Sequence, residues 1–218
     1  MSLSDADAYS FAMSSRRVQV IVVADSELAF LPLGDTSVVA TAVERAKAAD
    51  CKPEVTVWVA EHCLAAWEAL KPARRPRCDV SFIPSLAQLA RHADADVVLL
   101  HEAQRPLTLP STFDRVAEAV TGDAQSARPA HVVVDTLKVV DDTLLITATV
   151  NRDEVQSLTS PEGYLVSAIT EEEPPAGWFL AVNDPSAHAF VRGDQESLKI
   201  REAADVLLVE SFLAWQTS

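Results

Sequence analysis

The stretch Val97-Val98-Leu99-Leu100-His101-Glu102-Ala103-Gln104-Arg105-Pro106 decides the fold of this 218-residue sequence. It opens with a continuous apolar run, which is typical of a strand buried on both faces of a sheet. Polar residues and a proline then end the run before the next helix. In open α/β sheets, ligands bind just beyond the carboxyl ends of such strands. We therefore expect Glu102 and Arg105 to lie where the chemistry takes place.

Other apolar strands and amphipathic helices alternate along the rest of the chain. We expect strands at 18–23, 55–59, 78–83, 97–101, 130–135 and 189–191, helices at 61–70, 84–91, 161–170 and 202–215, a helix capped by Asp35 or Thr36, another capped by Ser111, and a helical turn at 178–182. The closing helix should bury Val206, Leu207, Val209, Phe212 and Leu213. This alternation predicts an α/β fold with a doubly wound, mostly parallel sheet.

Two segments fall outside that alternation. Residues 1–16 are small and polar and are expected to form a disordered tail or a tag remnant, which leaves 17–218 as a single domain. Residues 137–158 predict a β-hairpin that has little sheet to join in the main body. Because an isolated hairpin is barely stable in water, we expect this β-arm to pair with the arm of a second subunit. An edge hairpin folded on its own domain is the alternative.

Composition limits the classes of partner. The formal net charge of −14 repels nucleic acid and anionic membranes, so we expect neither as a partner. No apolar run approaches the ~20 residues that a membrane span needs. The three cysteines are an odd number without close spacing, which predicts no disulfide framework and favours a reducing cytoplasm. His62, His92, His131 and His188 show no spacing typical of metal ligands.

Several short motifs occur in a recognisable order. They are Leu31-Pro32-Leu33-Gly34, the stretch 101–106, Asp135-Thr136-Leu137-Lys138-Val139-Val140, Val150-Asn151-Arg152, Ser160-Pro161 and Ser197-Leu198-Lys199-Ile200, followed by Asp205. In this order and spacing the chain resembles 2-C-methyl-D-erythritol 4-phosphate cytidylyltransferase, an enzyme of the non-mevalonate isoprenoid pathway. The resemblance runs from about Val18 to the C-terminus. It implies a Rossmann-like nucleotidyltransferase fold and a homodimer formed through the β-arm.

The resemblance also implies an activity and a set of site residues. In that family CMP from CTP is joined to the phosphate of methylerythritol phosphate, with Mg²⁺ as cofactor. Lys199 and Arg105 would be catalytic; Glu102, Arg105, Thr136 and Arg152 would bind the sugar-alcohol phosphate, and Glu102 would also bind the metal. Ala24, Ser85 and Ser160 would lie at the nucleotide-binding positions. Such a transfer depends on positioning and on neutralising charge on oxygen, which cations and a metal-binding carboxylate provide.

The segment after the first strand departs from the family pattern. The family has a long glycine-rich loop there, carrying an Arg and a Lys, whose backbone N–H groups hold the triphosphate. Residues 24–30 are shorter, have neither glycine nor a cation, and include Asp25 and Glu27. Carboxylates at this position would repel a triphosphate. The sequence therefore predicts weak turnover or none.

The same residues can instead have ordinary structural roles. Glu102 and Arg105 can form a surface ion pair, Lys199 can be an ordinary solvated lysine, Arg152 can simply hold the arm, and His101 is expected to be a hydrogen-bonded core group rather than a base. A catalytically inactive homologue acting as a binding or scaffolding homodimer is the main alternative to an impaired cytidylyltransferase. A transferase for another nucleotide or sugar phosphate is the third possibility.

Overall fold

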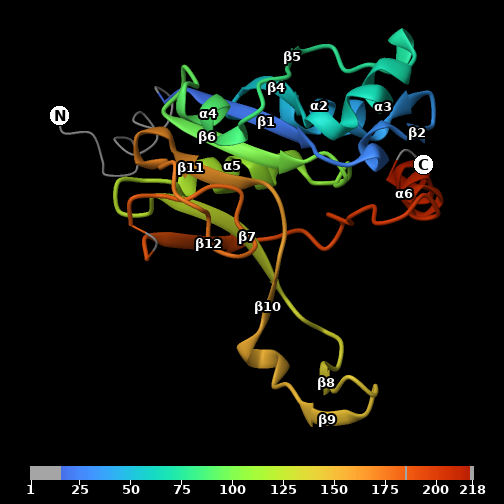
Figure 1. Ribbon diagram of the computed structural model, residues 1–218, viewed down its shortest axis with the longest axis vertical. Helices are drawn as coiled ribbons and strands as arrows, with labels where there is room; N and C mark the ends of the chain where they lie inside the picture. Colours follow the sequence, from blue (N-terminus) through green and yellow to red (C-terminus); the bar gives the residue numbers. More distant parts are fainter. Residues whose placement is uncertain (1–15, 185, 217–218) are drawn as a thin grey trace, which may run out of the picture.

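The computed structural model describes residues 16–184 and 186–216 and is built on one large mixed sheet (Figure 1). The strand order is β10 (Gln156–Leu158), β7 (Ser126–Val132), β11 (Glu162–Leu165), β6 (Val97–Glu102), β1 (Val18–Ala24), β4 (Glu54–Val59) and β5 (Asp79–Ser81), and β12 (His188–Arg192) also pairs with β7. Strands β6, β1, β4 and β5 pair in parallel, while β10 and β11 are antiparallel to their neighbours. The predicted α/β fold is confirmed.

The central strands β1 and β6 are buried on both faces. Val20 and Val22 belong to a core shared with helices α2 (Val38–Lys47) and α5 (Pro110–Ala119). Ile21 and Val23 belong to a second core on the opposite face, shared with α4 (Leu86–Arg91). Since successive side chains of a strand point to opposite faces, only a continuous apolar run can fill both cores.

The remaining elements are short, apart from the last helix. They are η1 (Glu27–Phe30), β2 (Pro32–Leu33), β3 (Thr36–Ser37), η2 (Glu61–Cys63), α3 (Leu64–Ala69), η3 (Pro72–Arg74), β8 (Lys138–Val140), β9 (Ile146–Thr149), η4 (Arg152–Glu154), η5 (Val166–Ala168) and α6 (Asp205–Gln216). Within the described residues, no helix is both long enough and apolar enough to cross a membrane.

The predicted helix over 161–170 is wrong, because the segment forms β11 followed by η5. Strand β11 lies antiparallel between β6 and β7 and joins the two halves of the sheet. A Cβ atom on Gly163 would lie 2.7 Å from Cγ1 of Val116, so a glycine is needed for α5 to pack this closely. Pairing with two strands outweighs the local preference of the segment.

Two predicted helix caps are also wrong. The helix expected to be capped by Ser111 is preceded by Leu109 and begins at Pro110, a position that suits proline because the first helical N–H has no intrahelical partner. The cap of α2 is Ser37, whose Oγ accepts a hydrogen bond from the Ala40 N–H at 3.3 Å, rather than Asp35 or Thr36.

Three further details differ from the expectations. The strand predicted at 130–135 is β7, which starts at Ser126 and ends at Val132. Residues 178–182 form no helical turn; Val182 instead makes a β-bridge with Ile169. Leu207 of α6 is 69% exposed, so the apolar residues of this helix do not all face the core.

The segment between β7 and β10 leaves the main sheet and projects away from it (Figure 1). Its strands β8 and β9 form an antiparallel hairpin, closed by a turn in which Oδ1 of Asp141 accepts hydrogen bonds from two backbone N–H groups. Five large apolar side chains of this hairpin are exposed: Val139, Val140, Leu144, Leu145 and Ile146. Its role in dimerisation stays a prediction, and the predicted tail falls mostly on residues 1–15, outside the described residues.

Candidate functional site

Three of the predicted site residues meet at the carboxyl end of β6. Glu102 ends the strand, Arg105 follows in the next loop, and Lys199 comes from the segment before α6. The Arg105 Nε atom binds one carboxylate oxygen of Glu102, and the Lys199 Nζ atom binds the other. Backbone contacts hold the two segments together, because Arg105 Nη1 donates to the Ser197 carbonyl at 2.6 Å and the Ile200 N–H donates to the Gln104 carbonyl at 2.9 Å.

The carboxylate of Glu102 lies in a largely covered position, with 15% of its side chain exposed. Burial alone would raise the pKa of Glu102, but the charge of Arg105 and the hydrogen bonds from Lys199 and Arg105 hold that pKa below its usual range. Glu102 is therefore ionised at neutral pH, and its charge compensates two cations at once.

A buried hydrogen-bond network holds the backbone of Glu102 in position. The Ser160 Oγ atom accepts a hydrogen bond from the Glu102 N–H at 2.9 Å and lies 2.9 Å from Nδ1 of His101. His101 is fully buried and its ring packs edge-on against Phe113. Burial, with a smaller contribution from the charge of Arg105, lowers the pKa of His101 to about 4. His101 is thus a neutral, hydrogen-bonded core group at neutral pH, as its place after a buried strand predicts.

A pocket of about 490 Å³, here called the cationic pocket, opens beside this cluster. Its lining comprises Arg105, His131, Ser157, Thr159, Gln195, Ser197, Leu198, Lys199, Arg201, Glu202, Asp205, Leu208 and Val209. Arg105, Lys199 and Arg201 bring three cationic groups to this lining, whereas Glu202 and Asp205 bring two carboxylates. An anionic small molecule of suitable size could bind here where Arg105 or Lys199 exchanges part of its pairing with Glu102 for phosphate oxygens.

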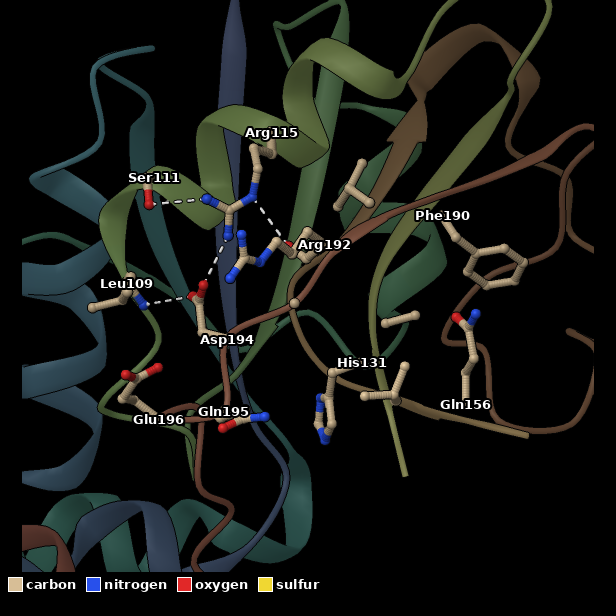
Figure 2. A pocket seen from close by; sticks show the side chains of 14 residues that line it. Leu109, Ser111, Arg115, His131, Gln156, Phe190, Arg192, Asp194, Gln195 and Glu196 are labelled. Carbon is tan, nitrogen blue, oxygen red and sulfur yellow. Dashed lines mark hydrogen bonds and ion pairs between the residues drawn. The ribbon is translucent and has the colours of Figure 1, made fainter. Parts of the chain in front are cut away.

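A neighbouring pocket of about 770 Å³, here called the outer pocket, shares His131 and Gln195 with the cationic pocket. Figure 2 shows these two side chains entering it from different walls. Asp194 fixes one wall, because its carboxylate binds Arg115 at 2.8 Å, the Thr112 hydroxyl and the Leu109 N–H at 3.2 Å. The segment that carries Gln195 and Lys199 is thereby anchored to the start of α5.

The loop after β1, residues 24–30 and here called the β1 loop, has a different character. Ala24 is fully buried and its carbonyl accepts a hydrogen bond from the Ala60 N–H at 3.1 Å. Inside the loop, the Leu28 N–H donates to the Ser26 Oγ atom at 3.3 Å and the Ala29 N–H donates to the Ser26 carbonyl at 3.0 Å. These amides are used within the loop, and the side chains of Asp25 and Glu27 are exposed.

The other predicted site residues lie apart from the cluster or are engaged elsewhere. Ser85 caps α4 by accepting a hydrogen bond from the Gln88 N–H at 3.2 Å. Thr136 and Arg152 line a hollow of about 450 Å³ at the arm, where Arg152 Nη1 donates to the Val134 carbonyl at 2.6 Å. Neither lines the cationic pocket of the described chain.

Sequence reasoning missed the residues of β7 and of the β10 segment that line the cationic pocket. His131 lies opposite Ser157 in the β7–β10 pairing, and Thr159 is two residues further on. No local motif marks these residues. Only the pairing register of two strands separated by the arm could have brought them together.

A Mg²⁺ ion at the end of β6 would have one carboxylate available there, that of Glu102. Among the described residues, no group of three or more His, Cys, Asp or Glu side chains is arranged to hold a metal. Mg²⁺ usually needs only one or two carboxylates, with substrate phosphates and water completing its shell. Glu102 is ionised, but both of its oxygens already bind cations, so it would hold Mg²⁺ only by giving up Arg105 or Lys199.

The fold and this pocket define a class: α/β proteins with a ligand-sized pocket at the carboxyl edge of a mostly parallel sheet. Residues 80–214 match the family model described as 2-C-methyl-D-erythritol 4-phosphate cytidylyltransferase. The chain is 32% identical over 200 residues to the protein of that name from Nocardia farcinica, covering 86% of each chain. The chain therefore belongs to the 2-C-methyl-D-erythritol 4-phosphate cytidylyltransferase family.

Solved structures agree with the fold. The chain superposes on the 2-C-methyl-D-erythritol 4-phosphate cytidylyltransferase of Thermus thermophilus with a TM-score of 0.68 at 21% identity, covering 91% of this chain and 99% of that one. The 4-diphosphocytidyl-2C-methyl-D-erythritol synthase of Anaerococcus prevotii gives a TM-score of 0.67 at 16% identity, covering 93% and 99%. At these identities the likeness establishes the architecture.

Proposed function

We propose that this protein transfers CMP from CTP to 2-C-methyl-D-erythritol 4-phosphate, with slow turnover because its nucleotide side is poorly equipped. The observation that carries the proposal is the convergence of Arg105 and Lys199 on Glu102, beside the cationic pocket. Membership of the family supports the type of reaction. The free thiols of Cys51, Cys63 and Cys78 support a cytoplasmic location.

The proposed reaction forms one P–O bond and breaks another. A phosphate oxygen of the acceptor attacks the α-phosphorus of CTP, and the bond to the β-phosphate oxygen breaks, so that pyrophosphate leaves with the electron pair. Arg105 would hold the acceptor phosphate, and Lys199 would neutralise negative charge on the transferring group. Mg²⁺, when bound through Glu102 and phosphate oxygens, would neutralise further charge on the triphosphate.

The β1 loop is the basis for proposing slow turnover. Two of its backbone N–H groups, those of Leu28 and Ala29, donate inside the loop, and the N–H of the following residue, Leu31, donates to the Leu28 carbonyl. The exposed carboxylates of Asp25 and Glu27 lie after the carboxyl end of β1, the strand next to β6. A triphosphate there would meet repulsion where the family provides glycine amides and cations.

A homodimer is part of the proposal. Thr136 and Arg152, which the family uses at the acceptor, lie on the arm and outside the cationic pocket. The exposed apolar side chains of the arm support a partner surface, and a second copy would bring its own Thr136 and Arg152 to this pocket. Sedimentation equilibrium of the full chain tests this, and a monomer at micromolar concentration contradicts it.

The test of function measures pyrophosphate release from CTP and 2-C-methyl-D-erythritol 4-phosphate with Mg²⁺. We expect slow release that requires both substrates, and a scan of ATP, GTP and UTP tests nucleotide choice. The Thermus thermophilus relative serves as the positive control for the assay. A folded sample that releases no pyrophosphate with any nucleotide rules out the transferase.

The acidic β1 loop favours a second candidate, an inactive homologue that acts as a binding or scaffolding homodimer. This candidate predicts no thermal stabilisation by CTP with Mg²⁺, whereas saturation at a hundredfold excess over Kd would add ~2.7 kcal/mol to the free energy of unfolding. A clear increase in melting temperature with CTP would exclude it.

A further inference from the structure

We propose that His131, Ser157 and Thr159 form a hydroxyl-binding wall in the cationic pocket and select a phosphate monoester that carries several hydroxyl groups. The inference rests on the proposed function, because it assigns specificity residues to the acceptor side of the same site. None of these residues belongs to the motifs that carry the family resemblance.

The strand register places the three side chains on one surface. In the antiparallel β7–β10 pairing, Ser157 lies directly opposite His131. Thr159 follows Ser157 by two residues, and side chains two apart along an extended chain point to the same side. All three line the cationic pocket. They form a row of two hydroxyls and one imidazole along one wall.

Four buried side-chain atoms of the described residues lack a hydrogen-bond partner, and two of them belong to this wall. The Nδ1 atom of His131 and the Oγ1 atom of Thr159 are buried and unpaired, and Thr159 as a whole is only 2% exposed. Buried polar atoms in folded proteins nearly always have a partner. Two such atoms on one pocket wall indicate that a ligand with hydroxyl groups completes the bonding there.

The segment that contains Gly193 passes close to the Thr159 side chain. The Gly193 N–H donates to the Ala130 carbonyl at 2.8 Å, and a Cβ atom on Gly193 would lie 3.2 Å from the Thr159 Oγ1 atom. The glycine allows the segment before Lys199 to approach this strand closely. The cations and the hydroxyl wall thus face one pocket from segments that are in direct contact.

The two walls have different chemistry, and this difference identifies the ligand class. Arg105 and Lys199 suit a phosphate, while His131, Ser157 and Thr159 suit neutral hydroxyl groups. A short carbon chain with a phosphate at one end and hydroxyls along its length satisfies both walls. A phosphate ester of a plain alkyl chain satisfies only the first.

The test compares two ligands of equal chain length by titration calorimetry on the full chain. D-erythritol 4-phosphate carries hydroxyls, and n-butyl phosphate does not. We expect wild-type protein to bind the polyol phosphate about tenfold or more tightly. Each of His131→Ala and Thr159→Val should reduce that preference about fivefold, the usual effect of losing one hydrogen bond, and leave butyl phosphate affinity unchanged.

Matched variants separate this inference from the proposed function. Thr159→Val should fold and melt like wild type, because the hydroxyl that it removes has no protein partner. His92→Ala, at an exposed helix end, is the control for His131→Ala. Equal affinity for both phosphates, or an unchanged preference in both variants, overturns the hydroxyl wall. Failure of wild type to bind either phosphate overturns the acceptor site, and the proposed function with it.

Discussion

The loops that follow β6 and β1 lie at the same edge of the sheet, after neighbouring parallel strands, yet they are built differently. After β6, Glu102 compensates two cations, and Ser160 and His101 support its backbone from a buried position. After β1, two carboxylates are exposed and the loop uses its own amides. The first region thus holds two cations paired with one carboxylate, and the second presents two carboxylates to solvent.

The difference shows that the core strands determine where the two loops lie, whereas the loop residues determine which ligand each loop can bind. The core strands fix where both loops lie, because their apolar side chains fill two cores and leave no freedom of register. The loop residues decide what binds there. A scaffold of this kind can keep an acceptor site while its nucleotide site changes, since the two loops share a sheet and few side-chain contacts, such as the 3.4 Å hydrogen bond from Gln104 Nε2 to Asp25.

The largest expected effect comes from removing a cation on the β6 side. Lys199→Met should reduce pyrophosphate release ~10²–10³-fold, because one charged donor to the transferring group is lost. Lys71→Met, which removes an exposed lysine outside the cationic pocket, should change the rate less than twofold. Steady-state assays on both variants measure the difference, and equal rates for Lys199→Met and wild type would remove Lys199 from the reaction.

The core strands can be predicted from the sequence more completely than the site can. The continuous apolar runs of β1 and β6 predict their strands, because such a run is typical of a strand that is covered on both faces of a sheet. Strand β11 escapes prediction because its buried Glu162 depends on Arg128, 2.8 Å away, and on the Tyr164 hydroxyl at 2.5 Å. The Arg128 partner is distant in sequence, and local patterns do not reveal it.

The site is predictable to the extent that it lies in short motifs. Glu102, Arg105 and Lys199 are identified by resemblance, and the structure brings them together. His131 and Thr159 belong to no motif, since their neighbourhood exists only after β7 and β10 pair across the arm. Register between strands separated by a long insertion cannot be inferred from composition or periodicity.

The buried His101 beside Glu102 should make the free energy of unfolding depend on pH below neutrality. Folding lowers the pKa of His101 from 6.5 to about 4, so the unfolded chain binds a proton that the folded chain excludes. Above pH 6.5, His101 is neutral in both states and does not weaken folding. As the pH falls from 6.5 to 4, protonation of the unfolded chain lowers the free energy of unfolding by about 3 kcal/mol. Urea unfolding of His101→Gln should show a flatter dependence on pH in that window.

His92→Gln provides the matched control, because His92 is exposed and hydrogen-bonds only within its own helix end. Its unfolding free energy should follow the wild-type pH dependence. If His101→Gln is too unstable to measure in urea, thermal melting of Ser160→Ala, which removes the hydrogen bond to His101 Nδ1, reports on the same network. Parallel pH profiles for wild type and His101→Gln would contradict the assignment.

The smallest expected effect is a change in CTP affinity when the carboxylates of the β1 loop are removed. It tests whether these two charges are the reason that the β1 loop binds a nucleotide poorly. Replacing two exposed carboxylates by amides, Asp25→Asn with Glu27→Gln, should tighten binding of CTP with Mg²⁺ about fivefold at low ionic strength, since surface charges near a triphosphate contribute about 1 kcal/mol. The gain should shrink in about 0.5 M salt. Calorimetric titration with CTP measures it.

The control is the double variant Glu54→Gln with Glu68→Gln, which removes two exposed carboxylates outside the β1 loop. Glu54 begins β4 and so lies at the amino end of that strand, away from the sheet edge that carries the β1 loop. This pair changes the net charge equally, so a similar gain in CTP affinity would mean that overall charge, not the β1 loop, limits binding. If the loop pair tightens CTP binding and the affinity for D-erythritol 4-phosphate stays constant, the two loops act independently. In that case the acceptor site was retained while local repulsion weakened its nucleotide partner site.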